Sequence, residues 1–128
     1  MRIRGGTCIG LLLGFPRFAH EGFVASMIKV IIERVVAEGL EIPYERAVEE
    51  LLTVMTRAKG YISGESLVDV RKPNHYIVVA RWSDQASWDK WFYSEDRKEV
   101  LTAIAPFLQT DEKFTVLRQL SYHTYSTR

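Results

Sequence analysis

The fold of this chain is decided by the stretch HYIVVARWSDQASWDKWF, residues 75–92. Its first half is β-branched and aromatic with almost no polar interruption, a pattern that predicts a strand buried on both faces. The pattern breaks before Asp84. Beyond the break, Trp88, Trp91 and Phe92 recur at i, i+3 and i+4, which is the spacing of one helical face. We therefore predict a central strand joined by a capped turn to an aromatic helix that folds back onto it.

The aromatic residues of this predicted helix have two readings. Aromatic side chains at helical spacing are commonly part of a core. In the alternative they wall a pocket beside the strand, and Trp88, Trp91 and Phe92 are then substrate-binding residues. Both readings stay open at this point, because each requires the same helix against the same strand.

Length and composition describe an ordinary globular domain. The chain has 128 residues, of which 47% are hydrophobic and 26% charged, and its net charge is +1. A balanced charge leaves no electrostatic footprint for nucleic acid. The longest apolar run near the N-terminus, residues 8–15, is too short to span a bilayer, so we expect no membrane partner. The single cysteine, Cys8, excludes an internal disulfide and a cysteine-based metal cluster and favours a reducing, cytoplasmic location.

Residues 1–26 differ from the rest of the chain, because glycine and proline interrupt them and no strand or helix period persists. We expect a disordered extension. Arg2 and Arg4 before a short apolar run, with small residues at 24–26, form a faint export signature. Alternatively, the start codon has been assigned too far upstream, since Met27 immediately precedes a clean strand pattern.

The remaining elements follow from periodicity and from turn residues. An amphipathic helix after Pro43 carries apolar residues at 0, 4, 7, 8 and 11 from Tyr44, and Gly60 is its predicted stop. Ser94 predicts the start of a further short helix, which Pro106 ends. The predicted strands are residues 28–36, 61–71, 75–82 and 113–122, and residues 123–128 form a polar tail.

The order strand, helix, strand, strand, helix, strand predicts an α+β, ferredoxin-like βαββαβ domain over residues 27–122. Such a domain has one antiparallel sheet with both helical segments on one face. The first and third strands are nonetheless apolar on both faces, so the second sheet face needs its own cover. We expect a second copy of the chain to supply it, giving a homodimer through the sheet faces with a barrel-like core.

Residues 27–122 resemble the antibiotic biosynthesis monooxygenase family of dimeric α/β-barrel proteins. The matching stretches are MIKVIIER at 27–34, GYISGESL at 60–67, residues 76–82, and the helix ASWDKW at 86–91 with Ser94 behind it. The resemblance implies a homodimer with a small cavity in each subunit between sheet and helices. Members of the family include cofactor-independent oxygenases of phenolic or quinol substrates, haem-degrading enzymes and proteins without known activity.

The haem-degrading branch uses an asparagine on the first strand, a tryptophan on the second helix and a histidine ten residues later. On the resemblance, Trp91 keeps the tryptophan, whereas Glu33 stands at the asparagine position and Leu101 at the histidine position. Leucine cannot ligate iron, and the three histidines of the chain have no ligand spacing among themselves. We therefore expect no metal and no cofactor.

A cofactor-free oxygenase needs a base that deprotonates its substrate and a dry aromatic cage around it. Glu33 is the candidate base, because the resemblance turns its side of the first strand toward the helices. Desolvation by Trp88, Trp91 or Phe107 would raise the pKa of this carboxyl and let it accept a phenolic proton. The alternative is an inert Glu33 paired with Arg81 or Arg34.

Two further residues complete the predicted substrate site. His75 reaches the pocket mouth in one reading and is an exposed hairpin residue after Pro73 in the other. Arg81 either binds an anionic group of the substrate or serves as a buried ion-pair or stacking partner. The predicted substrate-binding residues are thus Trp88, Trp91, Phe92, Phe107, Arg81 and His75.

Two classes of function remain. The first is a monooxygenase that acts on a small aromatic or quinol-like compound without metal or flavin. The second is a non-catalytic dimeric α/β-barrel module that binds a small apolar ligand. The sequence contains no phosphate-binding glycine loop and no nucleophile elbow that would indicate another chemistry.

Overall fold

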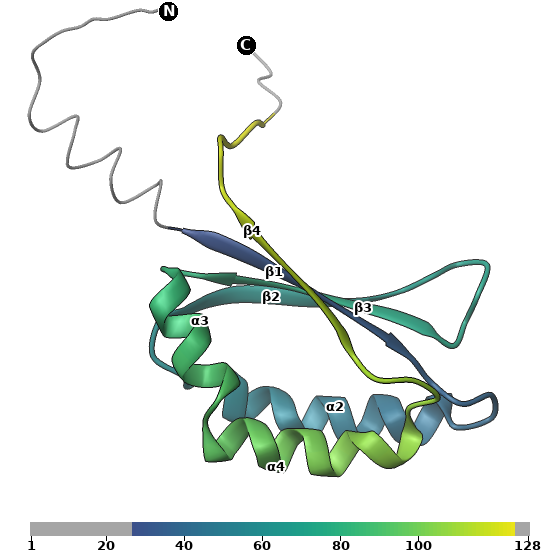
Figure 1. Cartoon of the computed structure of the whole chain (residues 1–128). Coiled ribbons are helices and arrows are strands. Elements are labelled where there is room, and N and C mark those ends of the chain that lie inside the picture. The colour runs from purple at the N-terminus through teal and green to yellow at the C-terminus, as the bar shows by residue number, and fades with distance from the viewer. Residues whose placement is uncertain (1–26, 125–128) are drawn as a thin grey trace, which may run out of the picture.

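The structure of the chain is a computed structural model that describes residues 27–124 (Figure 1). The predictions made for residues 1–26 lie outside the described residues. The elements in chain order are β1 (Ile28–Val35), α2 (Glu41–Met55), β2 (Tyr61–Val68), β3 (His75–Trp82), α3 (Gln85–Phe92), α4 (Glu95–Ile104), the 3-10 turn η1 (Ala105–Phe107) and β4 (Lys113–Arg118).

The four strands form one antiparallel sheet in the order β2-β3-β1-β4, and all the helices cover the same face of it (Figure 1). This is the ferredoxin-like arrangement, so the predicted α+β fold class is confirmed. The predicted bounds of the third strand agree with β3. The strands β2 and β4 at the sheet edges are shorter than predicted, because their pairing ends at Val68, opposite Tyr76, and at Arg118, opposite Ile28.

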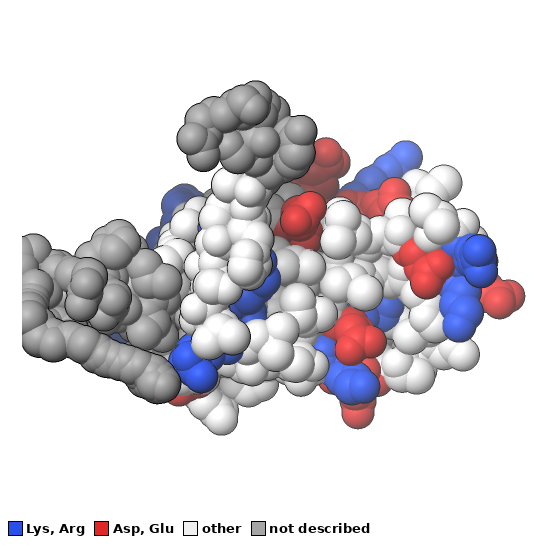
Figure 2. Space-filling view, turned by 90° about the horizontal axis from the view of Figure 1, so that it is seen from above, with Lys and Arg blue, Asp and Glu red and all other residues white. Residues whose placement is uncertain are grey.

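Burial alternates along the two central strands. On β1 the residues Ile28, Val30 and Ile32 are buried on the helix side, while the residues between them are only half-buried. On β3, Ile77 on the opposite side is exposed. In the single chain, therefore, only the helix side of the central strands is fully buried. Figure 2 looks onto the side that no helix of residues 27–124 covers, which we call the open face, and shows scattered charges among a larger uncharged area.

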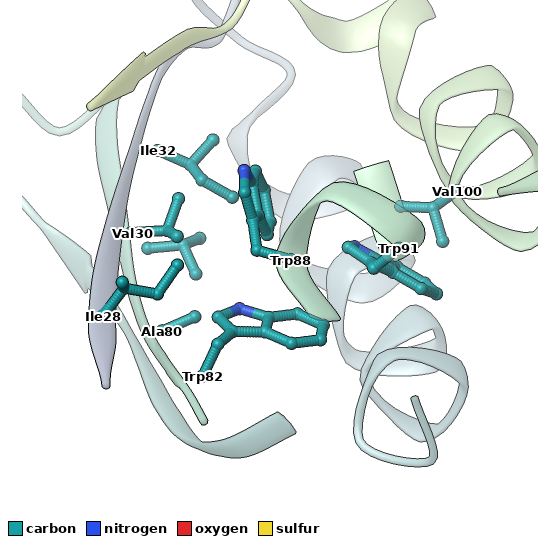
Figure 3. Packing of buried hydrophobic residues seen from close by; sticks show 9 residues of the cluster. Ile28, Val30, Ile32, Ala80, Trp82, Trp88, Trp91 and Val100 are labelled. Carbon is teal, nitrogen blue, oxygen red and sulfur yellow. The ribbon is translucent and has the colours of Figure 1, made fainter. Parts of the chain in front are cut away.

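The helix-facing core is built around the indole of Trp82, which has no exposed surface. Its ring centroid lies 5.6 Å from that of Trp88 and 6.3 Å from that of Trp91, and Figure 3 shows these three indoles together. The ring of Tyr61 meets the Trp82 ring edge-on at a centroid distance of 5.5 Å. Both helix tryptophans are buried against the sheet. Aromatic pairs at these distances stabilise a core beyond the area they bury. The aromatic stripe of α3 thus holds that helix on the central strand, as the core reading predicts.

Gly60 does not stop helix α2, and in this detail the sequence prediction is wrong. The helix ends at Met55, and residues 56–60 form successive turns before β2. Gly60 has a φ of +90°, and a Cβ atom added there would lie 2.3 Å from the Oγ of Ser87. The glycine is required by the close approach of this turn to the start of α3, and not by the helix end.

Two side-chain caps fix where the C-terminal helices begin. The carboxylate of Asp84 accepts a hydrogen bond from the Ser87 amide at 2.7 Å, and the Ser94 hydroxyl accepts one from the Arg97 amide at 3.1 Å. Both caps were predicted from the sequence, and both satisfy amides that the first helical turn leaves free. They divide the segment into α3 and α4, so that each helix packs at its own angle.

No helix among residues 27–124 has the length and apolarity needed to cross a membrane.

Replacement of Asp84 tests the cap of α3. The backbone hydrogen bond from Ser87 lowers the pKa of the Asp84 carboxyl. The folded-state pKa therefore lies below the unfolded value of about 3.9, so the stabilisation is complete above that pH and is lost as the pH falls through the folded-state pKa. We expect Asp84→Ala to lower the free energy of unfolding by about 1 kcal/mol at pH 7. The gap to the wild type should shrink below pH 4, as measured by urea unfolding.

Asp84→Asn is the matched control, because asparagine caps a helix without a titrating charge. Its stability relative to Asp84→Ala should not change between pH 7 and pH 3. A wild-type advantage over Asp84→Ala that persists undiminished at pH 3 would contradict this account.

Candidate functional site

A buried ion cluster lies at the end of the core away from Trp82. It starts from Arg34, which takes the next helix-facing position of β1 after Ile32 and is only 8% exposed. A guanidinium at such a position loses its hydration and must find acceptors within the protein. Arg34 finds two of them on other elements, the carboxylate of Glu112 and the hydroxyl of Tyr44 on α2.

Glu112 joins two arginines. One of its carboxylate oxygens accepts a hydrogen bond from Arg34 Nε at 2.7 Å, and the other accepts one from Arg97 Nη2 at 2.5 Å. All three side chains are less than a tenth exposed. We call these residues the Arg34–Glu112–Arg97 cluster. It ties β1, α4 and the segment before β4 together, and charge-assisted hydrogen bonds of this kind are among the strongest in proteins.

The electrostatics of the cluster favour the charged form of Arg34. Burial by itself would lower the pKa of Arg34, but the neighbouring Tyr44 and Glu112 together outweigh that effect and raise the pKa above its usual value. The cluster therefore contains two positive charges and one negative charge. Arg97 Nη1 is buried and has no hydrogen-bond acceptor among residues 27–124.

Two phenylalanine rings support the Arg97 guanidinium. Its central carbon lies 5.5 Å from the ring centroid of Phe92 and 5.4 Å from that of Phe114. The two rings meet edge to face at 5.1 Å. Cation–π contacts at these distances attract the guanidinium to the two rings without occupying its N–H groups.

An open hollow of about 620 Å³ adjoins the cluster, and we call it the basin. Its volume suits a small organic molecule. Its wall combines aromatic and aliphatic side chains with the charged groups of the cluster. The basin is lined by Phe92, Arg97, Leu101, Ala105, Leu108, Gln109, Thr110, Asp111, Glu112 and Phe114.

A second hollow of about 550 Å³ runs between α2 and the β2–β3 edge, and we call it the α2 groove. On its wall the Tyr76 hydroxyl donates a hydrogen bond of 2.6 Å to Glu45. Burial and this carboxylate raise the pKa of Tyr76 well above its usual value, so the phenol stays protonated. A narrow interior hollow of about 40 Å³ continues from the groove to Arg34.

The predicted substrate residues of the core and helices fall into three surroundings. Trp88 and Trp91 fill the core, and Trp91 also reaches the wall of a surface hollow between the end of α2 and the start of α4. Phe92 lines the basin. Phe107, the last residue of η1, packs against the Tyr44–Tyr76 pair. The structure thus brings Phe92 to a hollow beside the cluster, but it does not gather the aromatic side chains around one cavity.

The expectation that Glu33 faces the helices is wrong. The helix-facing residues of β1 have even numbers, so the Glu33 side chain lies on the open face, where it is paired in register with Ile77 and Lys113. Its role as a base stays a prediction, but it does not adjoin the basin.

Arg81 and His75 also belong to the open face. Arg81 is opposite Lys29 in the ladder and hydrogen-bonds Gln119 at 3.0 Å, with its guanidinium 5.6 Å from the Tyr122 ring. His75 is half-buried at the β2–β3 hairpin, where its amide bonds the carbonyl of Lys72. Their predicted contacts with substrate remain untested.

Sequence reasoning missed the cluster, although two signals for it were present. Arg34 continues the buried parity of Ile28, Val30 and Ile32. Arg97 shares the helix face of Val100 and Ile104, at i, i+3 and i+7. A charged residue at an inward position of each element indicates a buried ion pair. Glu112 had no such signal, because it lies in a connecting segment.

Among residues 27–124, no three histidine, cysteine, aspartate or glutamate side chains gather as a metal site would require.

The fold and the site define a class, namely small ferredoxin-like α+β proteins with a hollow beside the helix-covered sheet face. Within this class, the sequence model of a family described as antibiotic biosynthesis monooxygenase matches residues 27–103. The chain therefore belongs to the antibiotic biosynthesis monooxygenase family.

Solved structures resemble this fold at low sequence identity. A conserved protein of Methanosarcina mazei Go1 superposes with a TM-score of 0.70 and 16% identity over 77% of this chain and 98% of that chain. A variant of SnoaB, described as a cofactor-independent oxygenase from Streptomyces nogalater, gives 0.69 and 15% over 77% and 97%. These likenesses show the fold alone. A search among curated proteins found no match.

Replacement of Glu112 tests the cluster. Glu112→Gln leaves two buried guanidiniums without a counter-charge, so we expect the free energy of unfolding to fall by about 3 kcal/mol at neutral pH. The measurement is urea unfolding at a fixed protein concentration. Glu95→Gln is the matched control, because the Glu95–Lys98 ion pair of 3.0 Å lies on the surface. Its loss should change stability by less than about 0.5 kcal/mol. Equal effects of the two substitutions would contradict a structural role for the cluster.

Proposed function

We propose that this protein is a cofactor-independent monooxygenase that oxidises a small aromatic or quinol-like substrate bound in the basin. Membership in the antibiotic biosynthesis monooxygenase family supports the reaction class, and the similarity to SnoaB, a cofactor-independent oxygenase, agrees with it. The observation that carries the placement is the wall formed by Phe92 and Phe114 beside the buried Arg97.

The proposed reaction uses the substrate itself as the reductant. Removal of a proton gives an electron-rich anion that transfers electrons to dioxygen. One oxygen atom forms a C–O bond to a ring carbon, the O–O bond breaks, and the other oxygen leaves as water with two hydrogens from the substrate. The protein must bind the flat ring, accept the proton and stabilise negative charge on the substrate. The two phenylalanine rings suit the first task, and the guanidinium of Arg97 suits the third.

The proposed reaction also needs a proton acceptor at the basin. Glu112 already accepts hydrogen bonds from two arginines through both of its oxygens. Asp111 also lines the basin, it is exposed, and no ion pair is found for it among the described residues. We therefore propose Asp111 as the base within reach of a basin-bound substrate, with Glu33 as the competing candidate from the sequence.

The dimer belongs to the same proposal. The open face carries exposed apolar residues, among them Ile77, Leu67 and Leu117. Exposed apolar residues on a sheet face that no described helix covers favour contact with another sheet. We propose that a second copy of the chain covers this face, and that the enzyme works in the cytoplasm.

A non-catalytic binding module is the second candidate. The filled tryptophan core favours it, because the indoles of Trp82 and Trp88 pack against each other and leave the catalytic cage predicted from the sequence unformed. In that case the basin binds an aromatic molecule without turnover.

Oxygen uptake with a panel of hydroquinones tests the activity and the base. We expect Asp111→Asn to lower kcat by about 100-fold, because a general base is lost. Glu33→Gln should stay within twofold of the wild type, since its side chain faces away from the basin. A large loss of kcat in Glu33→Gln, with little change in Asp111→Asn, would instead identify Glu33 as the base. Absence of uptake by the wild type across the panel would favour the binding module.

Sedimentation of single-site variants tests the dimer. Ile77→Glu places a charge on the open face, so we expect the dimer dissociation constant to rise at least about tenfold, equivalent to about 1.4 kcal/mol. Ile42→Glu is the matched control, because Ile42 is an exposed isoleucine on α2, away from this face. A wild-type monomer at micromolar concentration would contradict the proposed assembly.

A further inference from the structure

We propose that the basin selects aromatic ligands that carry one carboxylate, and that Arg97 binds this carboxylate. This inference rests on the proposed function for its site and goes beyond it in naming the charge and chemical class of the ligand. It is carried by three observations at one place, namely an unpaired buried donor, an uncompensated charge and an aromatic wall.

The unpaired donor is Nη1 of Arg97. Only 6% of the surface of Arg97 is exposed. Its Nη1 atom is buried and lacks an acceptor among residues 27–124. Leaving a charged donor buried without an acceptor is costly, so such groups are normally satisfied by the protein, water or a ligand. Arg97 itself lines the basin, and we infer that the side chains over the buried Nη1 move aside for an acceptor bound there.

The charge of the cluster points to the same ligand. Arg34 and Arg97 contribute two buried positive charges, and Glu112 contributes one negative charge. One further anion would balance the buried groups. Asp111 on the basin rim is the opposing charge, but it is exposed, and solvent screens it more strongly than the buried groups. A monoanion is therefore favoured over a neutral ligand or a dianion.

The geometry of the guanidinium favours a carboxylate. Glu112 already engages Nη2, and the Phe92 and Phe114 rings hold the guanidinium carbon at about equal distances. The free Nη1 therefore has a fixed position next to an aromatic wall. A carboxylate attached directly to an aromatic ring can accept from this donor while its ring contacts Phe92 or Phe114.

Glu112 is a positioning residue in this scheme. It holds Arg97 from one side and Arg34 from the other, so the donor needs little rearrangement when a ligand binds. Preorganisation of this kind reduces the entropic cost of binding.

Calorimetric titration of the full chain without oxygen tests the inference, with 2-naphthoate and its neutral amide, 2-naphthamide, as probes. We expect the acid to bind the wild type at least tenfold more tightly than the amide. Arg97→Gln should remove this preference and bring the ratio of dissociation constants close to one. Arg46→Gln is the matched control, because Arg46 is an exposed arginine in the α2 groove, and it should retain the preference.

Leu101→Trp covers the case in which Arg97→Gln does not fold. Leu101 lies on the basin wall, is 38% exposed and is outside the ion cluster. The larger indole side chain at this position should fill part of the basin and weaken the binding of 2-naphthoate at least tenfold. Equal affinity of the wild type for acid and amide would overturn the inference, and so would a preference lost in Arg46→Gln but kept in Arg97→Gln.

Oxygen uptake separates this inference from the proposed activity. A preference for the acid that depends on Arg97, without turnover of any hydroquinone, would support the anion site and overturn the oxygenase. Turnover at equal kcat/KM for hydroquinones with and without a carboxylate would support the oxygenase and overturn carboxylate selection.

Discussion

The described helices cover only one face of the four-stranded sheet. The rest of this structure depends on that constraint. The helices bury the even-numbered side of β1 and leave the odd-numbered side open. The aromatic core, the ion cluster and the basin consequently lie on the covered side, and the exposed apolar residues of the open face lie on the other. Every side chain of the central strands belongs to one of these two environments, because neighbouring residues point in opposite directions.

Much of the fold could be predicted from local patterns, since its signals lie close together in the sequence. The strand β3 and the caps Asp84 and Ser94 depend on residues within a few positions of one another. The end of α2 was harder to predict. A glycine after a helix commonly marks the helix end, whereas Gly60 is needed for close contact with Ser87 on another element. Edge strands were overestimated for a similar reason, because a ladder ends where pairing ends and not where apolar composition does.

The candidate site was less predictable, for two physical reasons. A one-residue shift in a pattern of period two reverses the face of every residue, and this shift separates Glu33 from Arg34. The ion cluster in turn joins residues that are 78 and 15 positions apart, so its pairing could not be inferred from spacing. A charged residue at an inward position shows that a partner is needed, but the partner is identified only by the fold.

The three neighbouring indoles have a spectroscopic consequence. Trp82 and Trp91 lie nearly parallel, with an interplanar angle of 30°, while Trp82 and Trp88 are inclined at 67°. Chromophores fixed this closely in an asymmetric interior share their excited states, and such optical activity disappears when specific side-chain packing is lost. The near-ultraviolet circular dichroism signal of this protein therefore reports whether α3 remains packed on β3. Its measurement requires no added label.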